Sequence, residues 1–266
     1  MTELHKRLLV SLLLIPLALW VLYSGGLPLI IAMLVVVAFG SVELITMMRK
    51  AGIRISFGWV YISTAAYLAM VHLEGWDAPV LWLLLLLGIM ETAFNWEVKE
   101  SVPRLFATLF CFIYTGLFPV MITRLGLHHP DGKILLALIL MIWIVDSTAY
   151  FVGMTLGKKR NITGISPKKS REGFLAGALA PWLIVIIFSI SGVKIIPLAV
   201  LALIAVAAGI FGQLGDLLES MLKRYCNVKD SSNLIPGHGG ILDRSDSILL
   251  AGSFLYCAII VLDKVR

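Results

Sequence analysis

The chain has 266 residues, of which 59% are hydrophobic and only 14% are charged, and its mean hydropathy is +0.96. This composition excludes a water-soluble globular protein and is typical of an integral membrane protein in a lipid bilayer. The formal net charge of +6 is not carried by a separate basic domain, so we expect anionic lipids and phosphate-bearing substrates as partners and no nucleic acid.

Apolar runs of helical length dominate the sequence. Runs of roughly 17 to 25 residues suit α-helices that cross a hydrocarbon core of about 30 Å. The alternating segments of a membrane β-barrel are absent, so we expect an all-α polytopic protein. Because no linker is long enough to divide the chain, we expect one membrane domain over residues 1–266. The nine predicted spans are residues 8–23, 27–48, 57–73, 78–96, 105–125, 133–156, 172–191, 195–222 and 246–263, of which the third and fourth are weaker.

Basic residues are distributed unequally between the two sides of these spans. With nine crossings, 17 Lys and Arg residues fall on the side of the amino terminus and five on the opposite side. Cytoplasmic loops of membrane proteins are enriched in Lys and Arg, so the amino terminus is predicted to be cytoplasmic. The same rule places the basic loops 157–171 and 223–245 in the cytoplasm, where nucleotides are available.

Five carboxylates fall inside or beside the apolar runs. A carboxylate inside the membrane is costly, so each is a functional candidate. For Glu43 and Glu91 the alternative, a hydrogen-bonded carboxyl group between helices, is left open. The position of Asp146 favours a functional role, because polar and small residues follow it and its span leads into the first basic loop. The other two are Asp216 and Glu219.

The first basic loop and the residues that follow it, 157–173, carry six Lys and Arg residues. Basic side chains beside the turn at Pro167 suit a triphosphate or a lipid phosphate. The alternative is that these charges only set the topology of the chain. We interpret this segment as an accessory to the main candidate site.

The main candidate site is the stretch 216–246. Its first part continues an apolar run as a helix, and helical spacing places four polar residues on one face, namely Asp216, Glu219, Ser220 and Lys223. The sequence Pro-Gly-His-Gly-Gly at 236–240 cannot stay helical and exposes backbone N–H groups to an approaching anion. The stretch therefore joins a charged helix end to a turn that suits phosphate.

Two carboxylates of this stretch predict a metal-assisted reaction of phosphates. Asp216 is expected near the end of one helix and Asp243 near the start of the next, and Mg²⁺ usually takes one or two protein carboxylates. The alternative for Asp243 is the ordinary preference for acids at a helix N-terminus. Asp246 is interpreted as a further ligand or a capping residue. The cations that would offset phosphate charge are Lys223, Arg224, Lys229 and Arg244.

The residues of this stretch follow a fixed order, Ser220-x-Leu222-Lys223-Arg224, then Lys229-Asp230, then Ile235-Pro236-x-His238-Gly239-Gly240-Ile241-x-Asp243-Arg244-x-Asp246. This order resembles the signature of the phosphatidate cytidylyltransferases, the CDP-diacylglycerol synthases. The segment Ser166-Pro167-Lys168-Lys169-Ser170-x-Glu172-Gly173 resembles the second motif of that family. Ser245 departs from the signature, which usually has Thr or an apolar residue there, and this affects the packing of the turn and not its charges.

The resemblance implies a complete reaction. Mg-dependent transfer of the CMP moiety of CTP to phosphatidic acid would yield CDP-diacylglycerol and pyrophosphate in phospholipid biosynthesis. The resemblance implies Asp216 and Asp243 as the ligands of Mg²⁺, and it leaves open a second cation and a homodimer. We expect an integral protein of the bacterial inner (cytoplasmic) membrane, with its amino terminus and its active site on the cytoplasmic side.

The candidate residues form two groups by expected role. The residues expected to act in catalysis are Asp216, Lys223, Arg224, Asp243 and Arg244. Those expected to bind substrate are Ser166, Lys168, Lys169, Ser220, Lys229, Asp230, His238, Gly239, Gly240 and Asp246. A phosphate nucleophile is already ionised at neutral pH, so His238 is expected to contact phosphate or shape the loop instead of transferring a proton.

Two other functions compete with this interpretation. A CTP-dependent lipid kinase of the dolichol-kinase type also needs Mg²⁺ and basic residues at the membrane, but the complete order of residues in 220–246 argues against it. A transporter would place ionisable residues near the middle of the membrane on broken helices in both halves of the chain. Here the charges gather at one rim in the second half, which favours the transferase.

Overall fold

The fold is helical throughout the part of the chain that the structure describes. The structure is a computed structural model, and it describes residues 3–158, 165–166 and 169–265. These residues form helices and loops without a β-strand, and an isolated β-bridge joins Ile235 to Gly239. The all-α class expected from the sequence is confirmed.

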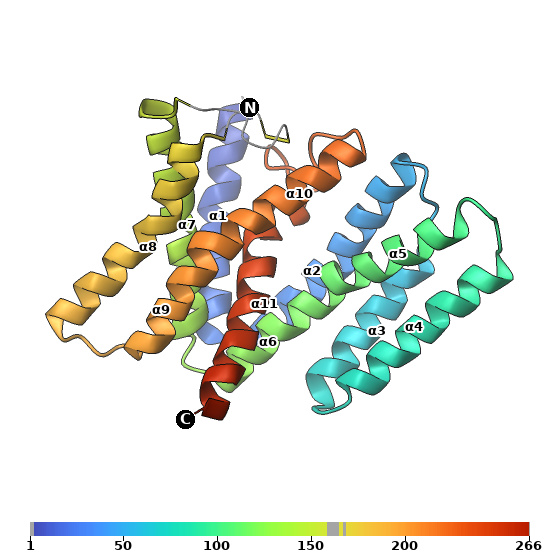
Figure 1. Cartoon of the computed structure of the whole chain (residues 1–266), viewed down its shortest axis with the longest axis horizontal. Helices are drawn as coiled ribbons and strands as arrows, with labels where there is room; N and C mark the ends of the chain where they lie inside the picture. The colour runs from blue at the N-terminus through green and yellow to red at the C-terminus, as the bar shows by residue number, and fades with distance from the viewer. Residues whose placement is uncertain (1–2, 159–164, 167–168, 266) are drawn as a thin grey trace. The chain divides into compact units, whose positions relative to one another are not determined.

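The helices follow one another along the chain, and two of the longer stretches contain a π-helical segment (Figure 1). Such segments are rare in proteins and often lie near functional sites. The α-helices are α1 (Glu3–Ser24), α2 (Gly26–Lys50), α3 (Gly58–His72), α4 (Asp77–Phe94), α5 (Ser101–Phe112), α6 (Phe118–His128), α7 (Lys133–Thr155), α8 (Arg171–Ser191), α9 (Leu198–Val206), α10 (Gln213–Tyr225) and α11 (Leu242–Val265). The π-helical segments are η1 (Ile113–Leu117), between α5 and α6, and η2 (Ala207–Gly212), between α9 and α10.

Seven helical stretches of the described chain are long and apolar enough to cross a membrane. They match the second predicted span and the fourth to the ninth. The two others are shorter, because α1 holds the apolar segment Val10–Ser24 and α3 has 15 residues. A full crossing needs about 20 apolar residues. Multiple membrane-spanning helices are therefore confirmed, whereas the count of nine stays a prediction.

Many large apolar side chains of these helices are exposed on the surface. Examples are Trp82 and Leu83 of α4, and Leu183 and Ile187 of α8. An apolar surface of this kind is unfavourable in water and is expected for helices that face lipid chains. The protein is accordingly an integral membrane protein.

The chain divides into two compact units, each assembled from separate segments. The first unit contains the described residues of Met1–Leu14, Leu27–Arg124 and Lys223–Arg244. The second contains Ile15–Gly26, Leu125–Leu222 and the described residues of Ser245–Arg266. Both units hold candidate site residues. The single domain expected from the sequence stays a prediction.

Polar side chains fasten the helices of the first unit to one another. Arg124 of α6 donates hydrogen bonds to both carboxylate oxygens of Asp77 of α4, at 2.7 and 2.8 Å. The hydroxyl groups of Ser41 in α2 and Thr115 in η1 are 2.8 Å apart and buried. The contact between Ser41 and Thr115 holds α2 in place two residues before Glu43.

Helices α7 and α8 lie side by side in the second unit (Figure 1). The absence of a side chain on Gly173 permits this, because a Cβ there would lie 2.6 Å from the carbonyl oxygen of Ala149. Gln213 of α10 donates a hydrogen bond to the carbonyl oxygen of Phe174 at 3.1 Å, which ties α10 to α8. The start of α8 is thereby held beside α7, the helix that carries Asp146.

Candidate active site

The stretch 216–246 folds as a helix, a loop and the start of a second helix. Helix α10 is followed by residues 226–241, here called the signature loop, which lead to α11. Asp216 lies in the first turn of α10 and Asp243 in the first turn of α11. The predicted order of helix, glycine-containing turn and helix is confirmed.

Lys223 and Asp243 form an ion pair in the first unit. Lys223 Nζ lies 2.7 Å from Asp243 Oδ1, and the two side chains are only 15% and 6% exposed. The other oxygen, Oδ2, accepts hydrogen bonds from the N–H and the hydroxyl of Ser231, at 2.9 and 2.8 Å, and from the N–H of Gly240 at 2.8 Å. Four donor groups therefore hold the Asp243 carboxylate in one orientation.

Glu43 of α2 enters the same network from a distant part of the sequence, and it is buried. Its Oε1 accepts hydrogen bonds from the hydroxyl of Ser232 at 2.6 Å and from the N–H of Ile241 at 2.9 Å. Its Oε2 accepts them from the hydroxyl of Ser231 at 3.0 Å and from the N–H of Leu242 at 2.9 Å. Glu43 is thus a hydrogen-bonded carboxyl group, and its partners belong to the signature loop and the start of α11.

Two glycines allow the signature loop to approach these carboxylates. Gly239 has a φ of +88°, a conformation that residues with side chains rarely adopt. A Cβ on Gly240 would clash with Ser231 Oγ and would lie 2.5 Å from Glu43 Oε1. In this structure the N–H of Gly240 is bonded to Asp243, so Gly240 contributes to the site by admitting the two side chains beside it.

His238 is held through its ring and through its backbone. Its Nε2 lies 3.0 Å from Ser11 Oγ of α1, and its carbonyl oxygen accepts a hydrogen bond from Arg244 Nε at 3.0 Å. The Arg244 side chain is otherwise exposed. Of the two roles expected for His238, these contacts support the shaping of the loop.

The second unit holds Asp216 in a more open pair. Lys169 Nζ lies 2.7 Å from Asp216 Oδ2, and the side chains are 35% and 38% exposed. The hydroxyl of Ser220, one turn along α10, donates to Asp216 Oδ1 at 3.4 Å. Asp146 of α7 interacts electrostatically with Asp216 and with Lys169. The structure therefore brings Lys169 of the accessory segment to Asp216.

Three further candidates of the stretch 216–246 are exposed, namely Arg224, Lys229 and Asp230. Exposure leaves their charged groups accessible to a ligand that arrives from water. An exposed Lys or Arg side chain gains little interaction energy from a nearby carboxylate, but it gains much more from a triphosphate, which carries several negative charges. The placement of Arg224 and Lys229 is therefore compatible with the binding of phosphate.

The accessory segment is described in part. The carbonyl oxygen of Ser166 accepts a hydrogen bond from the N–H of Lys169 at 3.2 Å, shortly before the start of α8. Lys168, predicted to bind substrate, lies outside the described residues. In α11, Asp246 Oδ1 accepts a hydrogen bond from the N–H of Ser247 at 2.7 Å, a local contact in the helix that carries Asp243.

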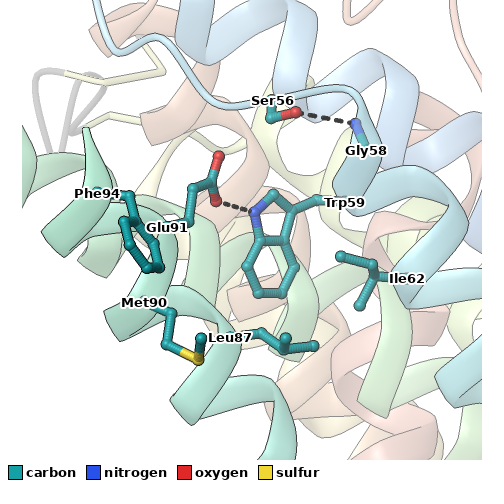
Figure 2. A pocket seen from close by; sticks show the side chains of 8 residues that line it. All are labelled: Ser56, Gly58, Trp59, Ile62, Leu87, Met90, Glu91 and Phe94. Atoms are coloured by element: carbon teal, nitrogen blue, oxygen red, sulfur yellow. Dashed lines mark hydrogen bonds between the residues drawn. The ribbon is translucent and has the colours of Figure 1, made fainter.

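A cavity of about 300 Å³ lies elsewhere in the first unit, between α3 and α4. Figure 2 shows that Glu91 points toward Trp59, whose indole N–H donates a hydrogen bond to the Glu91 carboxylate. The lining is mostly apolar and includes none of the residues bonded to Asp243 or Glu43. We interpret Glu91 as a carboxyl group that joins two helices.

Two serines of the signature loop, Ser231 and Ser232, were not predicted as site residues. Both hydroxyl groups bond to Glu43, and that of Ser231 also bonds to Asp243. The signal in the sequence is a pair of adjacent hydroxyl residues directly after the charged pair at 229–230. Such residues commonly bond to nearby backbone or carboxylate groups in turns.

The sequence is similar to known proteins along nearly its whole length. It matches the cytidylyltransferase family over residues 5–262. It is 34% identical to a phosphatidate cytidylyltransferase of Bacillus subtilis over 96% of this chain and 97% of that protein. A protein of the same name from Brucella abortus is 30% identical over 96% of this chain and 93% of that protein. Another, from Haemophilus influenzae, is 35% identical over 65% of this chain and 62% of that protein.

Proposed function

Because this chain belongs to the phosphatidate cytidylyltransferase family and is a nucleotidyltransferase, we propose that it transfers the cytidylyl group of CTP to phosphatidate. The products are CDP-diacylglycerol and pyrophosphate. The observation that carries this proposal is the similarity to proteins of that name over nearly the whole chain. The two lysine–aspartate pairs support it, because a reaction between two phosphates needs cations that offset their repulsion.

The carboxylates of Asp216 and Asp243 fit the requirements of Mg²⁺. The ion prefers oxygen ligands and takes one or two carboxylates from a protein, with water and phosphate oxygens as the rest. Among the described residues, no group of three or more His, Cys, Asp and Glu side chains is placed to hold a metal ion, so water and phosphate oxygens would have to complete the set of ligands. When bound, Mg²⁺ would neutralise and orient the triphosphate. In Asp243 the oxygen suited to this role is Oδ1, because Oδ2 already accepts three hydrogen bonds.

Lys169 and Lys223 exchange partners when substrate binds. In the structure each ammonium group lies 2.7 Å from one aspartate oxygen and neutralises that carboxylate. A phosphate group offers the same ammonium several anionic oxygens, so it can attract the lysine away from the aspartate. The guanidinium groups of Arg224 and Arg244 add positive charge beside the signature loop. Each lysine therefore neutralises an aspartate before the substrates bind and a phosphate group afterwards.

The transfer is a single displacement. A phosphate oxygen of phosphatidate forms a bond to the α-phosphorus of CTP, and the bond from that phosphorus to the oxygen bridging to the β-phosphate breaks. Pyrophosphate leaves with the electron pair. The protein binds, aligns and neutralises the reacting groups. Further substrate contacts are assigned to Ser166, Lys168, Ser220, Lys229, Asp230, Gly239 and Asp246, whereas His238 and Gly240 act by shaping the signature loop.

The direct test uses the purified full-length protein in lipid or detergent with CTP, phosphatidate and Mg²⁺. We expect CDP-diacylglycerol and pyrophosphate in equal amounts, and we expect chelation of the metal to stop their formation. The products can be separated by chromatography and identified by mass. The appearance of CDP with a newly phosphorylated lipid alcohol would replace this proposal with the lipid kinase.

The active site opens to the cytoplasm. The unequal distribution of Lys and Arg supports this orientation. In a variant without Cys111, Cys226 and Cys257, single cysteines at the exposed positions Lys158 and Asn233 should resist a membrane-impermeant thiol reagent added to intact cells. Both should react once the membrane is permeabilised.

The matched control is a cysteine at the exposed position Lys194, between α8 and α9, on the side predicted to face outward. It should react in intact cells. Ready labelling of Lys158→Cys or Asn233→Cys in intact cells, with Lys194→Cys protected, would reverse the orientation and the route by which CTP enters.

A further inference from the structure

We propose that Glu43 is a positioning residue of the active site, which holds the signature loop and the first turn of α11 and thereby fixes the Asp243 carboxylate. The inference rests on the proposed function, because it assigns a further residue to that same site. Glu43 touches no substrate in this assignment. It acts through the groups that it binds.

Glu43 caps helix α11 from another helix. The first N–H groups of a helix lack partners within the helix and usually receive them from a side chain just before it. Here the preceding residue is Ile241, whose side chain cannot accept a hydrogen bond. The Glu43 carboxylate accepts the N–H groups of Ile241 and Leu242 instead, each at 2.9 Å. Its negative charge also faces the positive end of the helix dipole.

The same carboxylate is connected to Asp243 by a second route. Ser231 Oγ lies 3.0 Å from Glu43 Oε2 and 2.8 Å from Asp243 Oδ2. A hydroxyl group has one proton, so it donates to one of these oxygens at a time. The position of the hydroxyl is therefore set by both carboxylates together. A change at Glu43 reaches Asp243 through Ser231 as well as through the backbone of Leu242.

The contacts of Glu43 differ from those of Glu91, a partly buried glutamate between two other helices. All four of its partners lie in the segment that carries or precedes Asp243, at 188 to 199 residues from Glu43 in the sequence. Glu91, by contrast, bonds to Trp59 on a neighbouring helix and to none of these groups. Glu91 therefore supplies a control for the substitution of a hydrogen-bonded glutamate that lies between helices but away from the signature loop.

The test compares Glu43→Gln with Glu91→Gln in the full-length protein. The NH₂ group of Gln is a hydrogen-bond donor, and it would face two donor groups that now bond to a carboxylate oxygen of Glu43. The loop should therefore shift. We expect kcat to fall roughly 10–100-fold, as for residues that orient a ligand of a metal. We also expect faster hydrogen exchange at the amides of Ile241 and Leu242, measured without CTP and without metal. Glu91→Gln should keep the exchange rates and the kcat of the unchanged protein.

A purely structural role predicts a different result. It would lower the melting temperature of Glu43→Gln and leave kcat unchanged at temperatures where the variant is folded, which would overturn the proposal. If Glu43→Gln does not fold, Ser232→Ala decides, because it removes one bond at 2.6 Å from the side of the loop. Ser232→Ala should raise the rate of hydrogen exchange at the amide of Ile241 and lower kcat. If neither quantity changes, the proposal is also overturned.

If the proposed function is wrong, a different experimental result shows it. An unchanged protein that is inactive on CTP and phosphatidate would refute the reaction. The comparison of hydrogen exchange would still show whether Glu43 holds the signature loop.

Discussion

Replacing Asp216 with Asn is expected to lower the rate of cytidylyl transfer by about a hundredfold or more, which is typical for the loss of a charged group in the transition state. The substitution keeps the shape of the side chain but removes the charge that faces Lys169 and that would bind Mg²⁺. The two side chains are 35% and 38% exposed, so the pair contributes little to stability. This variant should therefore lose activity while its stability stays close to that of the unchanged protein.

Initial rates over a series of Mg²⁺ concentrations, together with thermal unfolding in detergent, measure the two effects. The control is Asp131→Asn, which removes the partner of Lys133 in a still more open ion pair of 3.0 Å at the start of α7. That variant should keep its activity. If Asp216→Asn retains substantial activity at saturating Mg²⁺, Asp216 is not a ligand of the metal.

The helices of this protein could be predicted because each apolar run must satisfy its own backbone hydrogen bonds in lipid. The span predicted at 172–191 is α8, Arg171–Ser191, almost to the residue. The last span was predicted to start at residue 246, but α11 starts at Leu242. The difference arises because the first turn carries Asp243 and Arg244, and hydropathy does not count a charged turn as part of a membrane helix.

The π-helical segments η1 and η2 could not be predicted from the apolar pattern. A single wider turn leaves the composition of an apolar stretch unchanged, and only the hydrogen-bond pattern identifies it. Residues 207–212 accordingly fell inside one predicted span.

The charged residues of the site could be selected from the sequence, but their partners could not. Lys223 and Asp243 stand out because charges are rare in this chain and lie next to a glycine-rich turn. That Lys169 pairs with Asp216 and Lys223 with Asp243 depends on the fold of two separate units. The sequence leaves the role of Glu43 open for the same reason, because no local pattern connects a helix near the amino terminus with a loop nearly 200 residues later.

Replacing Asp243 with Asn should impair both activity and stability, unlike the change at Asp216. The Asp243 carboxylate accepts hydrogen bonds from four donor groups and its side chain is only 6% exposed. An Asn side chain has one oxygen, and its NH₂ group would face a donor at one of the two positions. Lys223, 15% exposed, would lose its counter-charge. Removing one member of such a buried pair costs about 3 kcal/mol or more.

The difference between the two aspartates can be measured without substrate. The melting temperature of Asp243→Asn in detergent should fall clearly below that of Asp216→Asn, and backbone amides of the signature loop, among them Ser231 and Gly240, should exchange faster. Asp230→Asn, in the same loop but at an exposed position, should lose less activity and keep its melting temperature. A melting temperature of Asp243→Asn equal to that of the unchanged protein would mean that the four donors do not depend on the carboxylate. Asp243 would then act on the substrates alone and would not organise the loop that carries it.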